Sequence, residues 1–111
     1  MKVSKTVQEM IGRIDRRQLR NNTQRVLLSM LCSEEEWVSR RSLRVPSVGS
    51  RLRDLRKEEF GGFDLRCATP SELERPVNSR TRGNTFYRLS PRSITVERIS
   101  KVFGEGVVSG R

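Results

Sequence analysis

A stripe of apolar residues between positions 23 and 33 constrains the fold of this chain most. In the segment TQRVLLSMLCS the apolar side chains recur at the spacing i, i+1, i+4 and i+5, at Val26, Leu27, Met30 and Leu31. This spacing is typical of a helix that is buried on one side. Apolar residues make up only 33% of the 111 residues and charged residues 32%, so the sequence predicts one small core built from a few amphipathic elements.

Downstream of this helix the sequence predicts a short extended segment and a short helix. Residues 37–38 are an apolar Trp-Val pair, and Ser39 is placed to cap a helix over residues 39–45. Pro46 marks a boundary, because proline disfavours helical geometry in the residue that precedes it.

A basic helix is predicted over residues 47–58, with Ser47 as its N-cap. One face is apolar and consists of Val48, Leu52 and Leu55. The opposite face carries the polar residues Ser50, Arg53, Asp54 and Lys57. We therefore expect one face to pack and the other to remain free for a ligand.

Residues 63–67 and 85–89 predict two strands that pair as an antiparallel hairpin. The segment 69–84 between them contains two prolines and a glycine without periodicity, which indicates a long loop at the hairpin tip.

The two ends of the chain predict further helices. Residues 4–18 form a basic amphipathic pattern that ends at Asn21 and Asn22, which can cap the next helix. Ser90-Pro91 predicts an N-cap followed by proline at the first position of a helix that ends near Phe103. The last residues, from 104 to 111, are expected to fray.

A surplus of cations indicates a polyanionic partner. The chain has 23 Lys and Arg against 13 Asp and Glu, which gives a formal net charge of +10. Most of these cations are arginine, whose planar fork matches phosphates and guanine edges and favours nucleic acid over an anionic membrane. A GC-rich genome offers another explanation for the ratio of arginine to lysine, but it does not explain the net charge.

The absence of histidine removes the commonest general base and the commonest metal ligand. The sequence also has no cluster of carboxylates and no glycine-rich phosphate loop that could provide catalytic groups or a ligand site instead. It therefore predicts that the chain is not an enzyme and holds no metal or cofactor. No membrane span and no signal peptide are expected, which predicts a cytoplasmic protein. Cys32 and Cys67 are expected to be reduced and buried as small apolar residues.

The order of the predicted elements is that of a winged helix-turn-helix. The segments RVLLSMLCS, WVS, VGSRLRDLRKEEF, FDLR and FYRL resemble the small helix-turn-helix domains that are common in phage and prophage proteins, over about residues 22–91. The resemblance implies an α+β fold of three core helices and a two-stranded wing, with additional N- and C-terminal helices. The expected organisation is a basic helix at 1–21, the winged domain at 22–90, and a helix with a frayed tail at 91–111. The second helix is shorter and the wing loop longer than is usual for the family.

The candidate DNA-binding residues fall into three groups. The N-terminal half of the basic helix is where helix-turn-helix proteins contact base edges, and it carries Ser47, Ser50, Arg51, Arg53 and Asp54. Arg56 and Lys57 come later and are expected to contact phosphates. The wing candidates are Arg75, Asn78, Arg80, Arg82 and Asn84. Two alternatives remain: a solvated helix in which Asp54 pairs with nearby arginines, and a solvated wing loop without a ligand.

Sequence-specific binding to double-stranded DNA, as a phage or prophage transcriptional regulator, is the function that these features favour. The alternative is a winged-helix module that docks on a protein or RNA, such as RNA polymerase or a ribonucleoprotein. The apolar stripes of the two terminal helices suggest a homodimer, although both helices could instead pack on their own domain.

Overall fold

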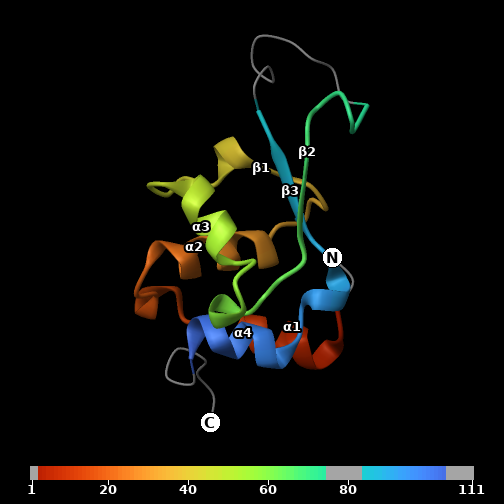
Figure 1. Cartoon of the computed structure of the whole chain (residues 1–111). Helices are drawn as coiled ribbons and strands as arrows, with labels where there is room; N and C mark the ends of the chain where they lie inside the picture. Colours follow the sequence, from red (N-terminus) through yellow and green to blue (C-terminus); the bar gives the residue numbers. More distant parts are fainter. Residues whose placement is uncertain (1–2, 75–83, 105–111) are drawn as a thin grey trace.

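The computed structural model describes residues 3–74 and 84–104 and shows an α+β fold (Figure 1). Four α-helices occur in these ranges: α1 (Lys5–Gly12), α2 (Asn22–Leu31), α3 (Val48–Asp54) and α4 (Val96–Phe103). The antiparallel sheet has three strands: β1 (Val38–Ser39), β2 (Leu65–Ala68) and β3 (Phe86–Leu89). Helices α1 and α4 lie together at one end of the molecule, and the β2–β3 hairpin rises from the other end (Figure 1).

Helix α2 lies at the centre of the core, as its apolar stripe predicts. The side chain of Asn21 caps it by accepting a hydrogen bond of 2.9 Å from the Gln24 N–H. Val26 and Leu27 are fully buried. The Gln24 side chain is buried too, and its amide donates to the Val102 carbonyl at 3.0 Å, while its oxygen accepts from the Arg20 N–H at 2.6 Å. This glutamine therefore fastens α2 to α4 without leaving its amide unsatisfied.

Both terminal helices are shorter than the sequence predicts. Helix α1 ends at Gly12, and a separate 3-10 turn at Arg16–Gln18 follows it. The Ser90-Pro91 pair opens only a 3-10 turn, not the C-terminal helix. That helix begins at Val96 instead, because Thr95 is extended and its hydroxyl accepts a hydrogen bond of 3.3 Å from the Arg98 N–H.

The apolar stripes of the terminal helices are buried within the chain's own core. Together with α2 and α3 they form one cluster, which includes Val7, Met10, Ile14, Ile94, Ile99, Val102 and Phe103. The structure thus removes the reason for predicting a dimer through these helices. All three predicted segments of the chain contribute to this core.

The predicted antiparallel hairpin of β2 and β3 forms, and its strands pair from Leu65–Leu89 to Ala68–Phe86. The predicted wing of two strands has a third strand in the structure, because β1 pairs with the outer side of β3. The expected extended segment at 37–38 is therefore present, shifted by one residue.

Both cysteines are exposed and free, so the expectation that they are buried is wrong. Cys32 follows the last turn of α2, beyond the end of its buried stripe. Cys67 lies in β2 next to Arg66, and these two central residues of the strand are exposed while its two end residues are buried.

Replacement of Ile99 by alanine tests whether α4 belongs to the core. Ile99 is fully buried, whereas Val96 on the same helix is 36% exposed. We expect Ile99→Ala to lower the free energy of unfolding by about 2–5 kcal/mol and Val96→Ala to lower it by less than about 1 kcal/mol, both measured by urea denaturation. Equal effects of the two substitutions would contradict the packing of α4.

Candidate nucleic-acid interface

Helix α3 is the helix predicted to read DNA, and it is shorter than expected. It spans Val48–Asp54, and the residues up to Glu58 form a turn that leads into a separate 3-10 turn at Glu58–Phe60. Ser47 does not cap the helix with its side chain, which corrects the prediction. Its backbone adopts the left-handed conformation, with φ of 55° and ψ of 42°, directly after Pro46. Ser47 therefore turns the chain into α3 through its backbone conformation. Its side-chain hydroxyl makes no capping hydrogen bond to the helix.

The two faces of α3 differ as predicted. Leu52 and Leu55 are fully buried and Val48 is partly buried against the core. On the other side Arg53 is exposed, and its guanidinium donates a hydrogen bond of 3.1 Å to the Ser50 hydroxyl. This bond holds the arginine along the helix surface, where its remaining N–H groups face solvent.

Asp54 is engaged by two cations on its own segment. Its carboxylate lies 3.4 Å from the Arg51 guanidinium and 3.3 Å from the Lys57 ammonium. The sequence left open the alternative that Asp54 pairs with nearby arginines. In the structure Asp54 does pair with neighbouring cations, one of which is an arginine and the other a lysine. A carboxylate held in this way offsets the charge of Arg51 and Lys57 and is poorly placed to accept from a base.

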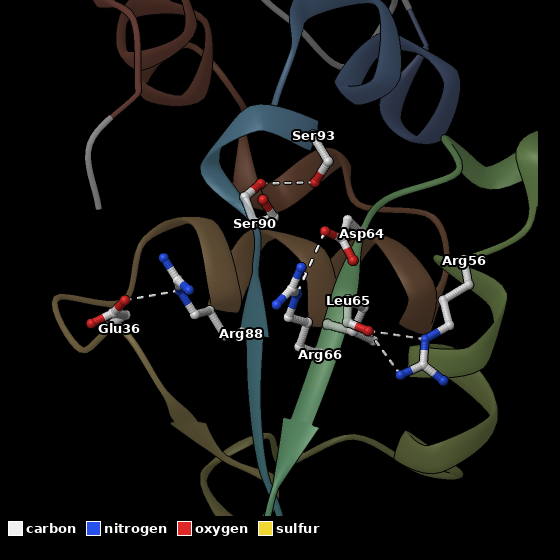
Figure 2. A network of polar contacts seen from close by, with 8 residues as sticks. All are labelled: Glu36, Arg56, Asp64, Leu65, Arg66, Arg88, Ser90 and Ser93. Atoms are coloured by element: carbon white, nitrogen blue, oxygen red, sulfur yellow. Dashed lines mark hydrogen bonds and ion pairs between the residues drawn. The ribbon is translucent and has the colours of Figure 1, made fainter. Parts of the chain in front are cut away.

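Arg56 connects α3 to the sheet. Its Nε and one terminal nitrogen both donate to the Leu65 carbonyl, at 3.2 Å and 2.8 Å (Figure 2). Because this carbonyl begins β2, the pair of hydrogen bonds fixes the end of the helix segment against the start of the hairpin. Arg56 therefore has a structural role that the sequence analysis did not predict.

Two arginines of the sheet are paired with carboxylates. Arg88 lies 2.9 Å from Glu36, and Arg66 lies 3.7 Å from Asp64 (Figure 2). These cations are partly neutralised, so the excess positive charge is not spread evenly over the molecule.

Most of the predicted wing residues lie outside the described ranges, namely Arg75, Asn78, Arg80 and Arg82. Asn84 is described, and it lies two residues before β3, where the tip loop joins the strand. It is only 8% exposed, and its amide donates a hydrogen bond of 2.7 Å to the Ser39 hydroxyl. This contact joins the hairpin to β1.

Arg40 is a cation beside α3 that the sequence analysis missed. A Cβ atom on Gly49 would lie 3.0 Å from a terminal nitrogen of Arg40, so the glycine allows the guanidinium to lie against the helix. The available signal was the glycine itself, because a glycine inside a helix costs about 1 kcal/mol and often marks a close approach.

The described residues do not form a metal site or a membrane span. Within the ranges 3–74 and 84–104, no three Cys, Asp or Glu side chains gather where they could share a metal ion. None of the helices in the described part of the chain combines the length and apolarity needed to cross a membrane.

Substitution of Arg56 distinguishes structural from ligand-binding arginines. We expect Arg56→Ala to lower the free energy of unfolding by about 1–2 kcal/mol, because it leaves the Leu65 carbonyl without its charged donor. The matched control Arg53→Ala should change it by no more than about 0.5 kcal/mol. Equal stabilities of the two variants in thermal or urea denaturation would show that the Arg56 contact has no structural role.

No protein-family model, curated protein or solved structure matches this chain. Its function must therefore be inferred from the geometry and charge of its own residues.

Proposed function

We propose that the chain is a winged helix-turn-helix protein that binds double-stranded DNA, with α3 in the major groove and the β2–β3 hairpin as the wing. The order of elements supports this proposal: α2, the 3-10 turn Arg40–Ser42, α3 and then the hairpin. The second helix of the motif is reduced to that single turn, which the Ser39 hydroxyl caps by accepting from the Arg41 N–H at 3.3 Å.

The exposed face of α3 is the observation that carries the proposal. Its buried side, Leu52 and Leu55, holds the helix on the core, while Ser50 and Arg53 remain on the accessible side. A major groove admits a helix of this width, and an arginine fork can donate two hydrogen bonds to a guanine edge. Among the predicted base-reading residues, Arg53 is thus the best placed donor, and Ser50 orients it.

The remaining cations fit a supporting role. Arg51 and Lys57 share the Asp54 carboxylate, and Arg40 lies beside the first turn of α3. Cations in these positions contact phosphates, which set the register of a protein on the duplex without reading its sequence. The net charge of +10 supplies the long-range attraction.

Regulation of transcription in a phage or prophage is the biological role that the family resemblance implies. A small DNA-binding regulator acts by occupying a site, so sequence preference is the property on which this role depends.

Selection from random DNA duplexes, followed by binding measurements, tests the proposal. We expect an enriched site whose affinity falls with salt, with a log–log slope of about 0.9 per phosphate neutralised. Arg53→Ala should weaken binding to that site by about 1–3 kcal/mol and relax the preference at one base pair. The exposed Arg92 in the turn before α4 provides the control Arg92→Ala, which should leave binding nearly unchanged.

Failure to enrich any duplex would overturn the proposal. Tighter binding to single-stranded or structured RNA than to any duplex would overturn it as well. An equal loss on all sequences for Arg53→Ala would mean that Arg53 contacts a phosphate and that another residue reads the bases.

A further inference from the structure

A groove runs along the exposed side of α2, on the face away from its buried stripe. Its lining includes the exposed Ser29, the half-buried Leu19, Arg16 from the turn Arg16–Gln18, and residues of the segment 42–45. It consists of two adjoining hollows of about 310 Å³ and 320 Å³, which share Arg16, Ser29 and Ser42. We refer to both hollows together as the α2 groove.

Charge changes sign between this groove and the turn that follows its end. The hollow at the N-terminal half of α2 is lined by Arg16, Arg25 and Arg44, and no carboxylate lines either hollow. The second hollow ends at Cys32 and Ser33, and the exposed acidic turn Glu34–Glu36 follows directly. One end of the groove is therefore basic and the other end leads into the acidic turn.

Several of these charges lack an ion-pair partner. Within the described residues, Arg16 and Arg44 have no carboxylate within ion-pair distance, and neither have Glu34 and Glu35. The Arg25 guanidinium donates a hydrogen bond of 3.1 Å to the Asn22 side chain, which carries no charge. In contrast, the carboxylates Asp54, Asp64 and Glu36 all pair with cations of the same chain. The basic end of the groove and the acidic turn beyond its other end thus hold opposite charges that are available to an outside partner.

We propose that a second copy of this chain occupies the α2 groove, with the two α2 helices antiparallel across a two-fold axis. This arrangement places the acidic turn of each copy on the basic end of the other. Because of the two-fold symmetry, the same contact between opposite charges then forms twice. If the axis passes at Ser29, Arg25 lies opposite Ser33 of the partner subunit and beside the partner's Glu34. The exposed stripe has the small side chains Ser29 and Cys32 at its centre, which allow two helices to approach closely.

The net charge of each copy does not prevent this contact. Two chains of charge +10 repel each other at long range, but the screening length is about 8 Å at 0.15 M salt. Facing charges within the groove are closer than this length and are partly shielded from solvent, so their attraction persists. We expect a weak dimer, with a dissociation constant of roughly 10–100 µM, because polar interfaces of this kind are small.

Self-association goes beyond the proposed DNA binding, and each of the two can be disproved without the other. Self-association is measured without DNA, so its absence would leave the role of α3 untouched. A dimer would present two α3 helices and would favour a site with two half-sites.

Charge reversal tests the contact by sedimentation velocity. Reversal of the basic end, Arg25→Glu with Arg44→Glu, makes both ends of the groove acidic, and Glu34→Lys with Glu35→Lys makes both ends basic. Each double variant alone should weaken self-association by roughly tenfold or more, and an equimolar mixture of the two should restore it as a heterodimer. The control Arg92→Glu with Lys101→Glu changes the net charge equally at exposed positions outside the groove and should not affect self-association.

A cysteine at position 29 tests the two-fold axis directly. In a chain with Cys32→Ser and Cys67→Ser, we expect Ser29→Cys to form a disulfide-linked dimer under mild oxidation, since the two thiols meet at the axis. The exposed hairpin position gives the control Ser71→Cys, which should remain monomeric under the same conditions.

Three results would overturn the inference. The first is a wild-type chain that is monomeric up to millimolar concentration. The second is a mixture of the two charge-reversed variants that associates no better than either alone. The third is a loss of DNA affinity in the Arg25 and Arg44 variant without any change in self-association, because the groove would then be a phosphate contact.

Discussion

The burial of Leu52 and Leu55 against the core is the interaction on which the proposed DNA-binding surface depends. Helix α3 has only seven residues, and an isolated helix of that length is not stable in water. It exists because its apolar face packs on α2 and because Arg56 fixes the chain beyond its end to the Leu65 carbonyl. The same contacts determine which side chains of α3 are buried and which are exposed. Arg53 is exposed because it lies on the side of the helix opposite to Leu52 and Leu55.

The terminal helices complete this support. Ile99 on α4 is fully buried, and the Gln24 amide joins α2 to the last turn of α4 through the Val102 carbonyl. Residues of both terminal segments belong to the same buried cluster as those of the central segment. The residues that a dimer through these helices would need are the residues that keep α2 in place. Self-association through the α2 groove, as proposed above, uses a different surface.

Apolar periodicity predicted the parts of the fold that depend on local spacing. The stripe of α2 and the inner face of α3 are where the sequence places them, and the hairpin strands begin within two residues of their predicted positions. A buried face repeats at the period of its own element. The residues at which the helices begin and end were less predictable. Ser47 has the side chain of an N-cap but turns the chain in a left-handed conformation, and Thr95 caps α4 in place of Ser90. Local preference was overridden by the path that the chain must take to bury its apolar residues.

The polar contacts of the candidate site were the hardest part to predict from the sequence. Arg56 and Leu65 are nine residues apart, and Asn84 and Ser39 are 45 residues apart, so no spacing rule joins them. All arginines look alike in a sequence, but the structure separates those that already have partners from those that do not. Asp54, a predicted base-reading residue, and Asn84, a predicted wing residue, both have contacts within the chain. The proposal therefore rests on Ser50 and Arg53.

Amide chemical-shift mapping by NMR, with a duplex recovered by selection, tests whether α3 is the DNA-binding element. We expect the largest changes on adding DNA to fall on α3, around Ser50 and Arg53, and the amides of α1 and α4 to change little. Changes centred on α4, or a uniform effect over the whole molecule with no maximum at α3, would contradict it.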